Sequence, residues 1–203
     1  MNISVALIPD NATGTDRYSA VLDAAFAVFL RYGFQRTTMD DIAKECGVSR
    51  PALYLLFKNK TDIFQALASA MFERIISDAG RALAGTGSLE TRLYQCLKTG
   101  ILDAMDKLIA SPHGAELMDM KHALSSDVYG SWRRGMVGLI SKAIDEEACN
   151  HDNKPILKGL SPDQLANMLL DGLEGLKARA NSSAEREAGA LGLVKLISGA
   201  VTR

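Results

Sequence analysis

The sequence predicts an all-α protein with about nine helices. Apolar residues recur with the period of a helix from the first element onward. Turn-forming residues follow at intervals that suit helices, and the alternation of apolar and polar residues that is typical of strands is absent. The chain has 203 residues, of which 47% are hydrophobic, so it can bury one large core or two small ones.

Composition and charge exclude several classes of protein. No run of about 18 uncharged apolar residues appears, and the N-terminus lacks the features of a secretory signal, so we expect a cytoplasmic protein without a membrane segment. Cys46, Cys96 and Cys149 lie far apart, and the histidines have no ligand spacing, which argues against disulfides and a metal site. We find no Gly-rich phosphate loop, G-x-S-x-G or H-E-x-x-H sequence, so we expect no enzyme and no cofactor.

The first helix follows an N-terminal arm. Residues 1–15 show no period and contain turn formers, so we expect a flexible arm there. The helix begins near Asp16 and ends at Gly33. Its inner face is given by apolar residues at helical spacing: Leu22, Ala25, Phe26, Phe29 and Leu30.

The next two helices are short and are separated by a tight turn. Thr38 and Asp41 have the spacing of a capping box, with Asp in place of the usual Glu or Gln, and Gly47 ends this second helix. Ser49 caps the third helix. Pro51 lies in its first turn, where the missing N–H costs nothing.

Six further helices complete the prediction. Asn59 can cap the fourth helix, which we expect to run to about residue 81. The breaks that separate the later helices lie at residues 85–88, 111–114, 150–159 and 181–182. Ser161 and Gln164 have capping-box spacing at the start of the penultimate helix. Ser182 and Glu185 repeat this spacing at the start of the last one.

The last two helices also carry small residues at close spacing. They are Gly172 and Gly175 in one helix and Gly189, Gly192 and Gly199 in the other. Glycine inside a helix costs up to about 1 kcal/mol relative to alanine. That many glycines therefore predict that helix backbones approach one another closely in this part of the chain.

The helices over residues 38–46 and 50–56, with a three-residue turn between them, form the pattern of a helix-turn-helix. In such a unit the second helix enters the major groove of DNA, with its N-terminal residues at the base edges. Leu53 and Phe57 lie four residues apart and can hold this helix against a core. Its other face is then free to carry basic and polar side chains.

The polar residues of this unit have chemical reasons to contact DNA. Helix N-termini and Thr, Tyr and Lys side chains bind phosphates, arginine can make two hydrogen bonds to a guanine edge, and an apolar side chain can touch a thymine methyl. We expect DNA contacts from Arg36, Thr37, Thr38, Ser49, Arg50, Pro51, Ala52, Tyr54, Leu55, Lys58 and Lys60. The alternative for Arg50 and Lys58 is a solvated side chain, and for Tyr54 a half-buried core ring. Residues 36–60 carry five basic and three acidic side chains, a modest net charge of +2.

This region resembles the N-terminal DNA-binding domain of the TetR/AcrR family of bacterial repressors. The resemblance covers roughly residues 16–75 and rests on Thr37-Thr38-Met39-Asp40-Asp41-Ile42-Ala43, Gly47-Val48-Ser49, Leu53-Tyr54, Phe57 and Lys60. It implies DNA contacts from Thr38, Ser49, Arg50, Ala52, Tyr54 and Lys60. Leu55 and Leu56 depart from it, because many relatives carry polar residues at these positions. The arm before Arg17 also lacks a basic cluster.

The resemblance implies a helix-turn-helix domain over residues 16–76 and a ligand-binding and dimerisation domain over residues 77–203. It also implies a homodimer that pairs the last two helices of each copy, and middle helices that enclose a pocket for an unidentified small molecule. Met and aromatic side chains suit such a pocket. The candidates for its lining are Met105, Met118, Met120, Tyr129, Trp132 and Met136. The alternative for each of them is an ordinary core position.

We therefore expect a ligand-responsive, sequence-specific transcriptional regulator, most simply a repressor that a small molecule releases from a near-palindromic DNA operator. Two alternatives stay open. One is a DNA-binding architectural or cell-division regulator of the same fold, which would bind many genomic sites and lack a closed pocket. The other is an enzyme or small-molecule-binding protein with vestigial DNA binding, which would need a catalytic or ligand-binding constellation elsewhere.

Overall fold

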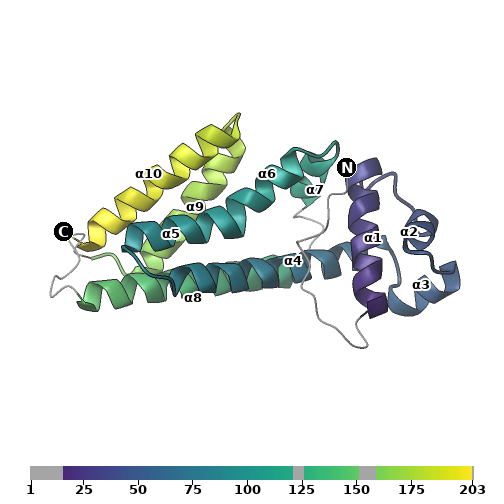
Figure 1. The fold of residues 1–203 in the computed structure, drawn as a ribbon, viewed down its shortest axis with the longest axis horizontal. Helices are drawn as coiled ribbons and strands as arrows, with labels where there is room; N and C mark the ends of the chain where they lie inside the picture. Colours follow the sequence, from purple (N-terminus) through teal and green to yellow (C-terminus); the bar gives the residue numbers. More distant parts are fainter. Residues whose placement is uncertain (1–15, 121–125, 151–158, 203) are drawn as a thin grey trace. The chain divides into compact units, whose positions relative to one another are not determined.

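The computed structural model describes residues 16–120, 126–150 and 159–202, so the predicted arm over residues 1–15 lies outside it. In these ranges the regular structure is entirely helical, which confirms the predicted fold class (Figure 1). The elements are α1 Asp16–Tyr32, α2 Met39–Cys46, α3 Arg50–Leu56, α4 Lys60–Leu83, α5 Leu89–Leu97, the π-helical η1 Lys98–Leu102, α6 Asp103–Ile109, α7 Gly114–Asp119, α8 Ser126–Asn150, α9 Pro162–Arg179 and α10 Ser183–Thr202. Because α5, η1 and α6 follow one another without a break, the described part of the chain contains nine helical segments.

The chain packs into two compact units that interleave along the sequence. The first contains the described residues up to Arg74 together with Ala104–Ser131, and the second contains Ile75–Asp103 and the described residues from Trp132 onward. Both α4 and α8 therefore contribute to each unit. The sequence predicted a single functional boundary near residue 76, whereas packing assigns the segment from α6 to the start of α8 to the first unit. The predicted functional domains stay a prediction.

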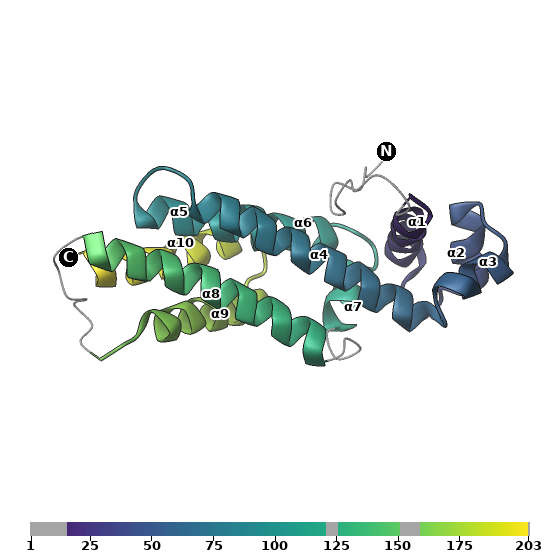
Figure 2. The ribbon, with the colours of Figure 1, turned by 90° about the horizontal axis from the view of Figure 1, so that it is seen from below.

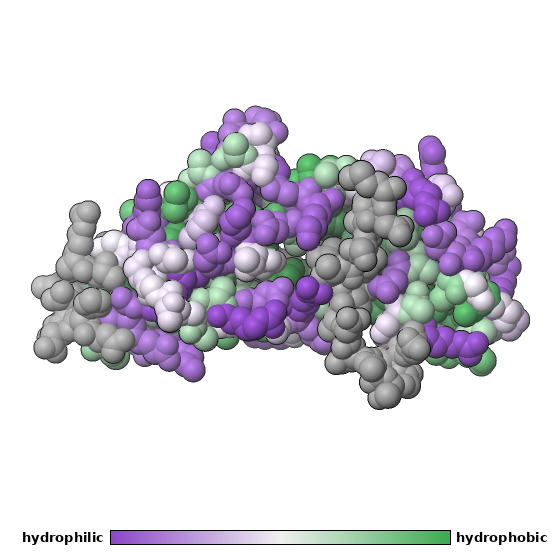
Figure 3. Space-filling model, viewed as in Figure 1, coloured by the Kyte–Doolittle hydropathy of each residue, from purple (hydrophilic) through white to green (hydrophobic). Residues whose placement is uncertain are grey.

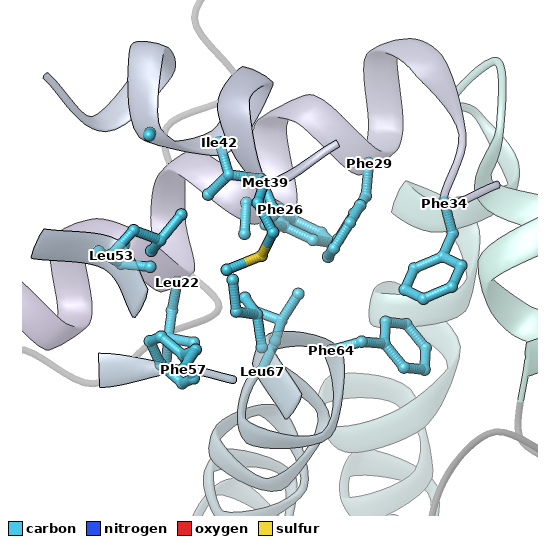
Figure 4. Close-up of a cluster of buried hydrophobic side chains, with 14 of the residues drawn as sticks. Leu22, Phe26, Phe29, Phe34, Met39, Ile42, Leu53, Phe57, Phe64 and Leu67 are labelled. Carbon is cyan, nitrogen blue, oxygen red and sulfur yellow. The ribbon is translucent and has the colours of Figure 1, made fainter. Parts of the chain in front are cut away.

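The core of the first unit gathers apolar side chains from α1, α2, α3 and α4, which point toward one another in Figure 4. Phe29, Ile42 and Leu53 are fully buried in it. The rings of Phe34 and Phe64 meet edge to face with centroids 5.4 Å apart. Burying one such side chain stabilises a fold by about 1.5–3 kcal/mol. The inner face that helical spacing predicted for α1 is confirmed.

The helix-turn-helix unit consists of α2, a short turn and α3, and Figure 2 shows both helices on the same side of α1. The predicted capping box starts α2: Asp41 N–H donates to Thr38 Oγ1 at 3.2 Å, and Thr38 N–H donates to Asp41 Oδ2 at 2.9 Å. Gly47 ends α2 with a φ of +70°, a left-handed conformation that favours glycine. Ser49 Oγ then accepts the Ala52 N–H at 3.3 Å and starts α3.

In the second unit, α9 and α10 approach each other closely at two glycines. A Cβ atom on Gly172 would lie 2.7 Å from Leu193 Cδ1, and one on Gly189 would lie closer still to Leu176. Close approach within the chain is thus confirmed for these two positions. The other three glycines of the two helices have no atom within 4 Å of such a Cβ atom; they are Gly175, Gly192 and Gly199.

The predicted starts of α9 and α10 are also present. Ser161 and Gln164 form a complete capping box at the start of α9. At α10, Ser182 Oγ accepts the Glu185 N–H at 3.2 Å, while Glu185 Oε2 accepts the N–H of Asn181 at 2.8 Å. The glutamate therefore reaches back one residue further than in a standard capping box.

Replacing Thr38 with alanine should destabilise the helix-turn-helix unit, because the substitution removes the side-chain cap of α2. Near neutral pH we expect Thr38→Ala to lower the free energy of unfolding by about 0.5–2 kcal/mol, measured by urea unfolding followed by circular dichroism. Hydrogen bonds from the Thr38 side chain and then from its amide lower the pKa of Asp41.

A carboxylate with a lowered pKa stabilises the folded state fully above about pH 4, and this stabilisation is lost as the pH falls through the lowered pKa. The stability difference between wild type and Thr38→Ala should therefore shrink in acid. A difference that stays constant from neutral to strongly acidic pH would contradict the pairing of Thr38 with an ionised Asp41.

Candidate nucleic-acid interface

α3 presents one side to the core and the other to solvent. Leu53 is fully buried, and Phe57, directly after the helix, is 6% exposed, so these two side chains fix α3 on the core as predicted. On the solvent side Leu55 is 87% exposed and Tyr54 is 44% exposed. Figure 3 shows hydrophobic and hydrophilic residues intermixed on the surface around α2 and α3. The side chains on the exposed side of α3 therefore do not belong to the core of the unit.

Arg50, the first residue of α3, lies between an acidic side chain and an aromatic ring. Its Nε lies 3.2 Å from Asp40 Oδ1, and its Nη1 donates to Asp40 Oδ2 at 3.3 Å. The guanidinium carbon lies 5.5 Å from the centroid of the Tyr54 ring. A hydrogen bond with Tyr54 and the negative charge of Asp40 raise the pKa of Arg50. The side chain of this permanently charged residue is 59% exposed, so a ligand on the surface can reach it.

One predicted DNA contact is corrected by burial. Thr37 is 1% exposed, and its Oγ1 donates to the Gly33 carbonyl at 2.7 Å, so its side chain is not on the surface. Ala52 is half-buried at the start of α3. The other predicted residues outside α4 are exposed side chains of the first unit: Arg36, Thr38, Ser49, Arg50, Pro51, Tyr54, Leu55 and Lys58.

Lys60, the first residue of α4, is engaged within the fold. Its Nζ donates to the carbonyls of Phe34 at 2.8 Å, Gln35 at 2.9 Å and Thr37 at 2.9 Å. An ammonium group has three donors, so these bonds use all of them. Nζ also lies 4.7 Å from the centroid of the Phe34 ring. The ammonium group therefore ties α4 to the turn before α2, and its predicted phosphate contact stays a prediction.

A second side chain holds the same turn. Glu116 on α7 accepts the Gln35 N–H at 2.9 Å through Oε1, and its Oε2 lies 3.6 Å from His113 Nδ1. No pattern in the sequence predicts this contact, because 81 residues separate the two partners. A shallow polar pocket of about 260 Å³ is lined by Arg31, Tyr32, Arg36, Asp41 and His113.

The six candidates for a small-molecule pocket are divided between the two units. Four of them are half-buried in the first unit: Met105, Met118, Met120 and Tyr129. The other two, Trp132 and Met136, are buried in the second unit. A different set lines an apolar cavity of about 50 Å³ in the first unit: Phe26, Phe64, Leu67, Ala68, Met71, Leu108 and Leu117. The six candidates therefore stay a prediction.

The described residues contain no candidate metal cluster, and one of their thiols, Cys96, is buried. Among them no group of three or more His, Cys, Asp or Glu side chains is placed to hold a metal ion. Burial raises the pKa of the Cys96 thiol to about 12, so it stays protonated at neutral pH and is a poor nucleophile. None of the described helices combines the length and the hydropathy that a membrane span requires.

Comparison with known proteins identifies the region that contains α3. Residues 21–67, which run from α1 through the helix-turn-helix unit into α4, match the family described as bacterial regulatory proteins, tetR family. This segment belongs to the tetR family. Its α3 is thus the second helix of a tetR-type helix-turn-helix.

Two curated relatives, YhgD and TtgR, each match half of the chain or less. It is 32% identical over 82 residues to the uncharacterized HTH-type transcriptional regulator YhgD of Bacillus subtilis, over 40% of this chain and 43% of YhgD. It is 28% identical over 102 residues to the HTH-type transcriptional regulator TtgR of Pseudomonas putida, over 50% of this chain and 47% of TtgR. The chain thus spans less than half the length of either relative.

Solved structures share the tetR-family fold over most of the chain. SmeT, the repressor of the Stenotrophomonas maltophilia multidrug efflux pump SmeDEF, superposes with a TM-score of 0.64 and 20% identity, over 95% of this chain and 92% of SmeT. A complex of SmeT with triclosan superposes with a TM-score of 0.60 and 20% identity, over 89% of this chain and 90% of SmeT. At this identity the likeness concerns the fold alone.

The triple contact of Lys60 predicts a structural role for this residue. Lys60→Ala should lower the free energy of unfolding by about 2 kcal/mol, because three carbonyls lose charge-assisted hydrogen bonds, two of which are partly buried. Urea unfolding followed by circular dichroism measures the loss. Lys58→Ala is the matched control, since the Lys58 side chain is exposed, and it should leave stability unchanged. Equal stability of the two variants would contradict this role.

Proposed function

We propose that the protein is a ligand-responsive, sequence-specific DNA-binding transcriptional regulator, most simply a repressor that a small molecule releases from its operator. The observation that carries the proposal is the exposed side of α3. Leu53 fixes the helix on the core, while Arg50 and Leu55 face solvent within the segment that matches the tetR family. An arginine and an apolar side chain at these positions suit a guanine edge and a thymine methyl.

The protein acts by binding rather than by catalysis in this proposal, and it acts in the cytoplasm, where DNA is available. YhgD and TtgR carry the names of transcriptional regulators, which supports this class of function. Thr38 and Ser49 mark the exposed starts of α2 and α3, where free N–H groups favour phosphate. Lys58 and Arg36 add positive charge to the same unit.

We propose that two copies pair through α9 and α10. Each helix carries a large apolar side chain on its surface: Met168 of α9 is 50% exposed and Leu196 of α10 is 66% exposed. Four exposed residues follow at four-residue intervals along α10: Ala184, Ala188, Gly192 and Leu196. A two-fold dimer would offer two α3 helices to successive major grooves, about 34–36 Å apart or somewhat wider, on a near-palindromic site.

The effector is proposed as a small apolar molecule. SmeT, a structural neighbour, has been solved in complex with triclosan, which supports a small-molecule effector for a protein of this fold. An effector acts only through the difference between its affinities for the DNA-bound and free states, typically about 1–3 kcal/mol. α4 contributes residues to both units. It is therefore a continuous helix through which effector binding can change the affinity for DNA.

The test of this function is a selection of genomic DNA fragments by the purified protein at near-physiological salt, repeated with Arg50→Ala. The proposal expects one or a few near-palindromic sites beside promoters, and Arg50→Ala should lose about 1–3 kcal/mol on them and relax the preference at one base pair. Lys58→Ala is the control, because a phosphate contact weakens all sequences alike. Binding to many unrelated fragments, or to none, would refute a specific regulator.

The dimer has its own test. Leu196→Glu should shift the protein from dimer to monomer, because each charge would be buried against its symmetry-related face, and sedimentation velocity measures the change. Ile109→Glu is the matched control, because Ile109 is an exposed aliphatic residue of α6, outside the proposed interface. An unchanged dimer in Leu196→Glu, or an equal effect of both variants, would refute pairing through α10.

A further inference from the structure

The carboxylate of Asp40 contacts the arginine that is best placed to contact a base. Asp40 lies in the first turn of α2, and its oxygens lie 3.2 Å and 3.3 Å from Nε and Nη1 of Arg50. Its side chain is 48% exposed. The capping box of α2 is made by Asp41, so the helix does not need Asp40 for its cap.

An exposed carboxylate on a surface that approaches DNA is repelled by the phosphates, so its presence there calls for a specific role. The same helix carries a second acidic residue in a comparable pair, because Glu45 accepts hydrogen bonds from both terminal nitrogens of Arg31 at 3.1 Å. Arg31, however, belongs to α1, whereas the partner of Asp40 belongs to α3. Of the two carboxylates, Asp40 therefore contacts the helix proposed to read the bases.

The contacts leave Arg50 with donors to spare. A guanidinium group has five N–H donors: one hydrogen-bonds to Asp40 Oδ2, the Nε donor lies against Asp40 Oδ1, and a third is used with Tyr54, so two remain. The Tyr54 ring covers the guanidinium at 5.5 Å. A carboxylate and a ring thus restrict the rotation of a long side chain before any ligand arrives, while enough donors remain for the two acceptors of a guanine edge.

We infer that Asp40 is a specificity-determining positioning residue, which holds Arg50 in the orientation that reads a guanine edge; the inference rests on the proposed DNA-binding function. Adenine offers N7 as an acceptor but an amino group in place of O6, so an arginine fixed for guanine cannot satisfy both of its donors there. A fixed orientation of Arg50 therefore raises the ratio of specific to random binding.

The experiment measures this ratio. Wild-type protein selects a preferred sequence from a random duplex library, and Kd values are then measured on that duplex and on a scrambled one of equal length at one salt concentration. Asp40→Ala should lower the ratio of the two affinities about fivefold or more. Glu45→Ala is the matched control, because it removes the same charge from the same helix, and it should leave the ratio unchanged.

A second comparison separates positioning from charge. In the Arg50→Ala background, adding Asp40→Ala should have no effect on the ratio, since the group that Asp40 positions is gone. Asp40→Asn serves as a second variant that retains the size of the side chain, and it should also lower the ratio. Circular dichroism verifies that each variant is folded.

The outcomes distinguish this inference from the proposed function. If wild-type protein selects a sequence but Asp40→Ala and Glu45→Ala change the ratio equally, or not at all, Asp40 does not position Arg50 and the regulator function stands. Asp40 also does not position Arg50 if Asp40→Ala lowers the ratio of affinities in the Arg50→Ala background as much as it does in the wild type. If wild-type protein selects no sequence, the proposed function and this inference fail together.

Discussion

The position of α3 depends on the burial of Leu53 and Phe57. An isolated helix of seven residues is far too short to be stable in water, because nucleation of a helix is costly and each added residue contributes little. α3 therefore exists only as part of the core that α1, α2 and α4 complete. Hydrogen bonds from Lys60 and to Glu116 fix the chain at Gln35, just before α2. The exposed surface of α3 is in this way supported by residues that lie outside α3.

Local rules predicted the fold well, because its elements are marked by side chains close to one another in sequence. The capping boxes at Thr38 and Ser161 and the left-handed Gly47 are decided by residues within three or four positions. The inner face of α1 follows from a simple period. For the same reason the sequence could assign Leu53 to the core and Leu55 to the surface.

The sequence could not predict contacts between distant residues in the candidate site. Lys60 was assigned to phosphate from its charge and position, but its three carbonyl partners lie 23 to 26 residues away, on a turn whose path only the tertiary fold decides. Thr37 was assigned to DNA from its neighbours, yet its burial depends on the packing of the whole unit. The pair of Asp40 and Arg50 was missed because two short helices must first fold onto one core.

Leu55 gives the surface of α3 a hydrophobic contribution to binding, which differs from that of charged residues in its heat capacity and its salt dependence. At 87% exposure its hydrocarbon side chain is almost fully hydrated in the free protein. Covering it with a base methyl would release this water and contribute a negative heat-capacity change, and such a contribution hardly depends on ionic strength. Phosphate contacts behave in the opposite way, since they weaken steeply as salt rises. A protein with only a modest positive charge around its helix-turn-helix can in this way retain part of its affinity at high salt.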